Sequence, residues 1–167
     1  MNLDKLVLEY KNSKDDIVFN KIYDNTLPIV RAAIINYIYD RETVLDLIQD
    51  TYLSFINNID KYNAKSFTNW IYTIAKNKSL DYLKKKKETS LTEYDNIPSS
   101  DISPHIKFLI NKLDPNLREV FVLKVLVGYS SKQVSNSLGI KVNEVNKLYY
   151  EAKEILRKEL SDKDEIK

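Results

Sequence analysis

Hydrophobic residues recur at helical spacing early in the chain. Between residues 16 and 39 apolar side chains repeat every three or four positions, which predicts a helix. Pro28 must interrupt this pattern, either by starting a second helix with Asn25 or Thr26 as its cap, or by kinking a single helix. A second stripe over residues 42–59 predicts another helix. Its expected core positions are Val44, Leu47, Ile48, Thr51, Tyr52, Phe55, Ile56 and Ile59.

The stretch NNIDKYNAKS that follows has no apolar period and is predicted to be a loop. The next stretch, SFTNWIYTIAKNKSLDYLKKKK, predicts a long helix over residues 66–87 with Ser66 as its cap. Phe67, Ile71 and Ile74 share one face of this helix and are expected to lie in the core. Trp70 fits either core packing or contact with a ligand.

Residues 88–104 contain two prolines and no hydrophobic period, and we interpret them as a flexible linker. Four more helices are expected beyond it. The predicted fold class is therefore all-α: two small helical bundles joined by a linker. The expected domains are residues 1–87 and 105–160, with a tail over residues 161–167.

The second bundle has the sequence features of a helix-turn-helix. Ser130 or Ser131 can cap a short helix, and Gly139 supplies a left-handed turn residue. A second helix follows, with an apolar stripe at Val142, Val145, Leu148 or Tyr149, and Ala152. Such a helix can enter the major groove of DNA, although a plain helical hairpin would give the same spacing.

The amino-acid composition of the chain limits the classes of protein to which it can belong. The 167 residues include only two glycines and four prolines, which agrees with a mainly helical chain. With no cysteine, one histidine and no glycine-rich phosphate loop, the sequence offers nothing from which an enzyme active site could be assembled. We expect neither a metal nor a cofactor. No apolar run is long enough to span a membrane and no secretory signal opens the chain, so a cytoplasmic protein without membrane insertion is expected.

The charge distribution points to a polyanion partner. The whole chain has a net charge of +2, but residues 66–87 alone hold six lysines and one aspartate. The same stretch is rich in aromatic side chains. Aromatic faces can hold unpaired bases by stacking while lysines follow the phosphates, so this helix combines two features needed to bind opened DNA.

Three stretches together resemble a known family. DRETVLDLIQDTYLSFINNIDKYN is similar to the core-binding helix and loop of bacterial RNA polymerase sigma factors of the extracytoplasmic-function (ECF) type. The lysine-rich helix is similar to the promoter-melting helix of that family, and LDPNLREVFVLKVLVGYSSKQVSNSLGIKVNEV to its fourth region. The resemblance implies a transcription initiation factor that keeps only the second and fourth regions.

The resemblance implies roles for residues of the first bundle. Tyr62 and Asn77 match positions where related factors capture a flipped base of the −10 promoter element. A loop tyrosine packed on the bundle and a surface asparagine are the alternative. The remaining −10 candidates are Lys61, Asn63, Lys65, Lys76, Lys84 and Lys85. The lysines should contact phosphate rather than read sequence, unless they form only a solvated face.

One face of the helix over residues 42–59 is expected to bind the polymerase. Asp46, Gln49, Asp50 and Leu53 lie opposite the core stripe, and a leucine among carboxylates suits a protein interface. By resemblance this face binds the clamp helices of the largest subunit of core RNA polymerase. The polymerase flap, promoter DNA and an anti-sigma factor are further candidate partners. An ordinary solvated face is the alternative.

The candidate recognition helix departs from the family pattern. The family usually places basic residues where this chain has Asn146, Leu148 and Glu151. The remaining −35 candidates are Lys141, Asn143, Lys147, Tyr150 and Lys153. So few positive charges predict a shallow salt dependence of DNA binding. A free-standing helix-turn-helix regulator remains the rival reading, but it would give the predicted polymerase face and the Tyr62 loop no function.

Overall fold

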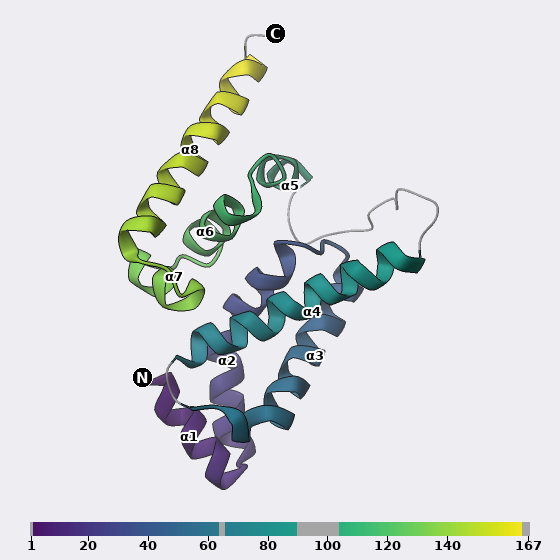
Figure 1. Ribbon diagram of the computed structural model, residues 1–167, viewed down its shortest axis with the longest axis vertical. Coiled ribbons are helices and arrows are strands. Elements are labelled where there is room, and N and C mark those ends of the chain that lie inside the picture. The colour runs from purple at the N-terminus through teal and green to yellow at the C-terminus, as the bar shows by residue number, and fades with distance from the viewer. Residues whose placement is uncertain (1, 64–65, 90–103, 165–167) are drawn as a thin grey trace.

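A computed structural model describes residues 2–63, 66–89 and 104–164 of the chain. These residues form helices and no strand, which confirms the predicted all-α class (Figure 1). The elements in chain order are α1 (Leu3–Ser13), α2 (Asp16–Ile35), α3 (Arg41–Asn58), the short 3₁₀ helix η1 (Ile59–Lys61), α4 (Phe67–Thr89), α5 (Pro104–Ile110), α6 (Pro115–Val125), α7 (Ser131–Leu138) and α8 (Val142–Asp164). The predicted linker lies almost wholly outside the described residues.

The first bundle packs α4 across α2 and α3, with α1 against α2 and α4. Its core is aromatic and aliphatic: Phe55, Phe67, Ile22, Ile29 and Ile71 are all fully buried. Most of the expected core positions of α3 are buried as predicted. Ile56 is the exception and remains 36% exposed, so that assignment was wrong.

Helix α2 continues through Pro28 as a single helix, which decides between the two alternatives. Thr26, in the turn before the proline, donates its hydroxyl to the Ile22 carbonyl at 2.7 Å. It also shares a 2.9 Å hydrogen bond with the Tyr52 hydroxyl on α3. The helix ends at Ile35 rather than at residue 39. Asp40 then caps α3, since its carboxylate accepts from the Thr43 N–H at 2.9 Å.

Helix α1 was not anticipated, although its signals are present in the sequence. Asn2 caps it by accepting from the N–H groups of Asp4 and Lys5. Val7 and Tyr10 are buried. The Tyr10 ring packs 5.6 Å from Phe19 and 5.7 Å from Phe55, measured between ring centroids. Helix α1 is therefore part of the core of the first bundle.

The second bundle contains the predicted helix-turn-helix in α7 and α8. Ser130 and Gln133 form a reciprocal capping box at the start of α7. Gly139 closes α7 in the left-handed conformation, with φ of 68°. Val145 and Ala152 are fully buried as expected, but Val142 is 39% exposed and does not belong to the core stripe.

The two bundles pack against each other. Helix α6 lies on α2, and α7 lies on α4. Val120, Val122 and Val134 of the second bundle belong to the same buried cluster as Ile29 and Ile71 of the first. A smaller cluster, formed by Leu113, Leu117, Ala152 and Leu156, holds α8 on α6 and on the turn before it.

Candidate nucleic-acid interface

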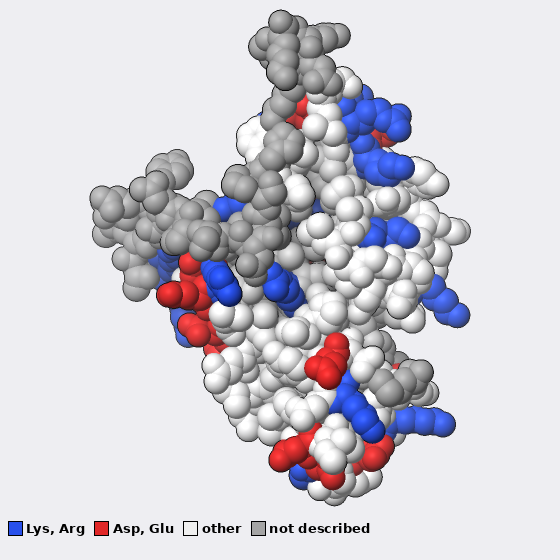
Figure 2. All heavy atoms as spheres, turned by 180° about the vertical axis from the view of Figure 1, so that it is seen from behind, with Lys and Arg blue, Asp and Glu red and all other residues white. Residues whose placement is uncertain are grey.

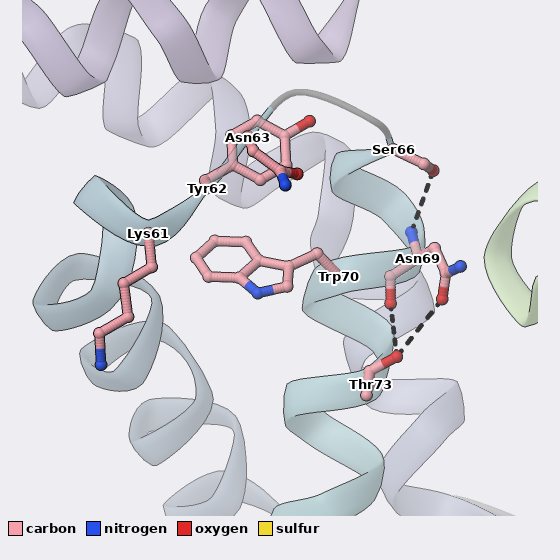
Figure 3. A pocket seen from close by; sticks show the side chains of 7 residues that line it. All are labelled: Lys61, Tyr62, Asn63, Ser66, Asn69, Trp70 and Thr73. Atoms are coloured by element: carbon pink, nitrogen blue, oxygen red, sulfur yellow. Dashed lines mark hydrogen bonds between the residues drawn. The ribbon is translucent and has the colours of Figure 1, made fainter.

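A pocket of about 400 Å³ opens at the start of α4. It lies between η1 with the loop after it and the first turns of the helix (Figure 3). Its lining consists of Lys61, Tyr62, Asn63, Ser66, Asn69, Trp70 and Thr73. The volume falls within the usual range for pockets that bind small molecules.

Aromatic rings form one wall of this pocket. The Tyr62 and Trp70 rings lie 5.2 Å apart with an interplanar angle of 30°. The Phe67 ring meets Tyr62 edge-on at 5.6 Å. Tyr62 is only 6% exposed, so it packs on the bundle as well as lining the pocket. Trp70 likewise packs on the core and faces the pocket, so its core packing is confirmed and its contact with a ligand stays a prediction.

Polar groups of α4 line the opposite side. Ser66 accepts from the Asn69 N–H at 3.3 Å, which confirms Ser66 as the cap of the helix. Thr73 donates its hydroxyl to the Asn69 carbonyl at 2.8 Å and contacts the Asn69 side-chain oxygen at 3.3 Å. An amide side chain such as that of Asn63, which also lines the pocket, can donate to and accept from the edge of a base.

The Tyr62 hydroxyl donates to a carboxylate of α1, that of Asp4. Burial is the main cause that raises the pKa of Tyr62, and the hydrogen bond to Asp4 raises it further. The same Asp4 oxygen accepts from the Phe67 N–H at 2.8 Å. Sequence reasoning missed Asp4, because nothing local in the sequence relates it to a loop so far along the chain.

The other −10 candidates are spread along the surface of α4 and η1. Asn77 is exposed, but it lies one turn beyond Thr73 and does not line the pocket. Lys61 is exposed and donates to Asn58 at 2.9 Å. Lys84 and Lys85 are exposed near the far end of α4. Lys65 lies outside the described residues.

Lys76 is engaged with the second bundle. Its ammonium group lies 2.7 Å from the Glu119 carboxylate on α6. The Tyr37 hydroxyl donates to the same Glu119 oxygen at 2.6 Å, and burial together with this bond raises the pKa of Tyr37. Arg118 donates to the Asn36 carbonyl at 3.1 Å. Lys76 therefore contacts protein rather than solvent alone in this arrangement.

The −35 candidates all lie on the exposed surface of the second bundle. The exposed candidates are Lys141, just before α8, and Asn143, Lys147, Tyr150 and Lys153, along the first half of α8. Seen from behind, Lys and Arg side chains follow the edge of the molecule where α8 lies (Figure 2). Asn146 has an internal role instead, since its side-chain oxygen accepts from Ser131 of α7 at 2.6 Å.

The predicted polymerase face is exposed on α3. Asp46, Gln49, Asp50 and Leu53 all reach solvent. A groove of about 370 Å³ runs beside them between α2 and α3. Sequence reasoning missed two of its exposed apolar residues, Leu45 and Ile56. The face therefore combines carboxylates with a larger apolar surface than predicted.

The described part of the chain offers neither a metal site nor a membrane-spanning helix. No group of three or more His, Cys, Asp or Glu side chains among those residues could hold a metal ion. None of the helices they form is long and apolar enough to cross a membrane.

Comparison with known proteins gives two family matches. Residues 22–89 match the model of sigma-70 region 2, and residues 106–156 match that of sigma-70 region 4. The "ECF RNA polymerase sigma factor SigW" of Bacillus subtilis is 29% identical over 140 residues, covering 70% of this chain and 75% of that protein. The "ECF RNA polymerase sigma factor SigE" of Mycolicibacterium smegmatis is 24% identical over 127 residues. That match covers 67% of this chain and 49% of the relative, so the chain spans about half of its length.

Two solved structures share the fold. CnrH in complex with the cytosolic domain of CnrY has a TM-score of 0.71 and 20% identity, and the match covers 96% of this chain and 99% of that one. The sigma factor RpoE of Bartonella quintana, in complex with the anti-sigma factor NepR, has a TM-score of 0.63 and 21% identity. The latter match covers 86% of this chain and 96% of that one.

Proposed function

The chain belongs to the ECF sigma factors of bacterial RNA polymerase, and on that premise we propose that it recognises the −10 and −35 promoter elements and promotes strand opening. It acts as an initiation factor that binds core RNA polymerase and directs it to promoters. Sigma factors form a family without enzymatic activity, so the protein contributes binding and positioning only. The observation that carries the proposal is the aromatic-walled pocket at the head of the lysine-rich helix α4.

The pocket provides a place for a base that has left the duplex. Stacking on an aromatic side chain is worth about 1–3 kcal/mol per base. Unstacking and flipping a base costs a few kcal/mol, so the two are of similar size. Tyr62 and Trp70 supply the aromatic wall, and Asn63 supplies an amide group for the base edge. Asn77 contacts the strand one turn further along α4.

The other candidate surfaces have separate roles in this proposal. Lys61 contacts a phosphate beside the pocket, and Lys84 and Lys85 contact phosphates near the far end of α4. Lys65 is a further candidate for phosphate contact. The α3 face with Asp50 and Leu53 binds the clamp helices of the polymerase, and the second bundle lies by the flap. The exposed side of α8 contacts the −35 element with few positive charges, so its affinity should depend only weakly on salt.

The two bundles pack against each other in the structure, an arrangement that we call the closed form, and they must separate for this function. The −10 and −35 elements are named for their positions upstream of the transcription start, so they lie roughly 25 base pairs apart, which corresponds to about 85 Å along B-form DNA. In the structure, however, a Cβ added at Gly139, in the turn of the helix-turn-helix, would lie 3.2 Å from the side-chain nitrogen of Asn69, a residue that lines the pocket. The two DNA-binding surfaces cannot reach both elements from there. Lys76 becomes available for phosphate only after α6 moves away.

An anti-sigma factor is a candidate partner for the closed form. Both structural neighbours are complexes, one with the cytosolic domain of CnrY and one with the anti-sigma factor NepR. These two proteins share the fold of this chain, and the anti-sigma partner is our proposal for this chain. A protein that holds the two bundles together would keep both DNA-binding surfaces away from a promoter.

Run-off transcription tests the proposed function. Core polymerase should transcribe specific genomic fragments only when this protein is added. A free-standing helix-turn-helix regulator would bind duplex DNA but would neither co-purify with core polymerase nor start transcription. Specific DNA binding without any effect on core polymerase would overturn the proposal.

A further inference from the structure

The carboxylate of Asp4 forms hydrogen bonds on both sides of the loop that borders the pocket. Asp4 accepts a hydrogen bond from the Tyr62 hydroxyl at one end of the loop. It also accepts one from the Phe67 N–H at the other end, at 2.8 Å. Tyr62 is a wall of the pocket, and Phe67 begins the helix that supplies the remaining walls. Asp4 therefore fixes the distance between the two sides of the pocket.

Asp4 projects from an element that is itself held firmly. Helix α1 is capped by Asn2 and anchored in the core by Val7 and Tyr10. Lys11, near its other end, donates to the Asp60 carbonyl in η1 at 3.0 Å. Helix α1 thus contacts the loop region at two separate points. It also lies outside residues 22–89, the part of the chain that matches the region 2 model.

The environment of Asp4 suits a charged acceptor. It lies in the first turn of α1, and it bonds the first N–H of α4, so its negative charge faces the N-terminal ends of two helices. Hydrogen bonds to a charged group are stronger than those between neutral groups. Without Asp4, the buried Tyr62 hydroxyl and the Phe67 N–H would both lose their partner.

We propose that Asp4 is a positioning residue that holds Tyr62 and the start of α4 in the arrangement that receives an extruded base. Helix α1 is then a functional part of the −10 site rather than only a support of the bundle. This inference rests on the proposed function. It does not require Asp4 to touch DNA, because pocket walls that are already held in place lose less conformational freedom when the base binds.

The test uses the full chain with core polymerase and a promoter that the wild type opens. Asp4→Ala should lower the permanganate reactivity of −10 thymines about tenfold, since a hydrogen-bonded charged group is lost. Asp4→Asn keeps an acceptor oxygen and should show an intermediate loss. Asp16→Ala is the matched control, because it removes an exposed first-turn aspartate from α2, away from the loop. It should open the promoter as the wild type does.

Tyr62→Phe removes the same hydrogen bond from the other side while it keeps the ring. Its loss should be similar, and the Asp4→Ala, Tyr62→Phe double variant should lose no more than the larger single effect. Trp70 is the only tryptophan of the chain and lines the pocket, so its fluorescence reports the geometry directly. Its emission should shift to the red in Asp4→Ala and stay unchanged in Asp16→Ala.

The outcomes separate this inference from the proposed function. If the wild type opens no promoter with core polymerase, the proposed function fails. If the wild type opens the promoter and Asp4→Ala opens it equally well, only the role of Asp4 is overturned. Losses that simply add in the double variant would also contradict it, because they would show that Asp4 and Tyr62 act separately. Should Asp4→Ala unfold, Tyr62→Phe still tests the bond.

Discussion

Gly139 satisfies two constraints at one residue. Its φ of 68° lies in the left-handed region, which favours glycine. A β-carbon at this position would also lie 3.2 Å from the Asn69 amide nitrogen, closer than most such contacts. The turn of the helix-turn-helix thus requires glycine for its own conformation and for its approach to α4.

Gly139→Ala should therefore destabilise the protein by about 1 kcal/mol from backbone strain, and by more if Asn69 cannot move. Gly128→Ala is the matched control: its φ is 77°, but a β-carbon there would meet nothing within 4 Å. Urea denaturation measures both free energies of unfolding. Equal losses would show that the contact with Asn69 contributes nothing.

Local sequence signals predicted several residues correctly. The capping of α7 by Ser130, one of the two serines predicted for that role, and the left-handed Gly139 both follow from patterns within a few positions. The partners of Tyr62 and Lys76 could not be predicted in this way. Asp4 and Glu119 are far from them in sequence and meet them only through the packing of whole helices.

At the scale of an element, the local sequence of helix α4 predicted only some of its buried residues. Phe67 and Ile71 are buried as predicted, but Ile74 is only half-buried, while Tyr72 and Ala75 are buried. The helix packs on α2 and α3 on one side and on α7 on another. A hydrophobic stripe predicts one core face well. It does not reveal that a second bundle covers another face.

Helix α3 has a buried face and an exposed one, and the exposed face can be changed without disturbing the core. Leu53 is 50% exposed, and Asp50 beside it is exposed too. Leu53→Asp or Asp50→Lys should weaken binding to core polymerase at least tenfold, because a centrally buried interface side chain is commonly worth 2 kcal/mol or more. Co-purification with core measures this.

The matched control for that prediction is Leu8→Asp, which places the same charge on an exposed leucine of α1. Circular dichroism establishes that the variants remain helical. Wild-type binding of core polymerase by a folded Leu53→Asp variant would exclude this face of α3.

At the scale of the whole molecule, the contact between the bundles includes buried polar groups that favour separation. Among the described residues, the buried side-chain atoms without a hydrogen-bond partner are the Asn36 oxygen, the Tyr72 hydroxyl and the Arg118 Nε. Asn36 and Arg118 lie at this contact, and Tyr72 is close enough for Glu119 to raise its pKa, after burial as the main cause. An unsatisfied buried group costs about 1–3 kcal/mol, and opening would let water satisfy it.

Glu119 holds the bundles together through Lys76 and Tyr37. Glu119→Ala should shift the molecule toward an open form by about 1–2 kcal/mol, a value reduced because Lys76 remains partly exposed. The chain has no cysteine, so cysteines introduced at exposed Glu9 and Lys158 can carry dyes for a distance measurement by energy transfer.

The matched control is Glu154→Ala, which removes an exposed glutamate whose ion pair with Arg157 lies within α8. Its energy transfer should equal that of the wild type, while Glu119→Ala should lose the closed population. An unchanged closed distance in Glu119→Ala would show that the apolar contacts alone hold the bundles.

Permanganate reactivity of promoter thymines tests the central claim, that the pocket beside α4 holds an extruded base. Tyr62→Ala would confuse the test, because truncating a buried ring commonly costs several kcal/mol of stability. Asn63 and Asn77 are exposed, so an Asn63→Ala, Asn77→Ala double variant should fold normally, with Asn57→Ala on α3 as its control.

The account predicts that this double variant binds core polymerase as the wild type does but leaves the −10 thymines of duplex DNA several-fold less reactive. On a template opened beforehand by a mismatched bubble, part of its transcription should return, since most of the unstacking cost is already met. Duplex opening equal to that of the wild type and of Asn57→Ala would contradict the assignment of the pocket.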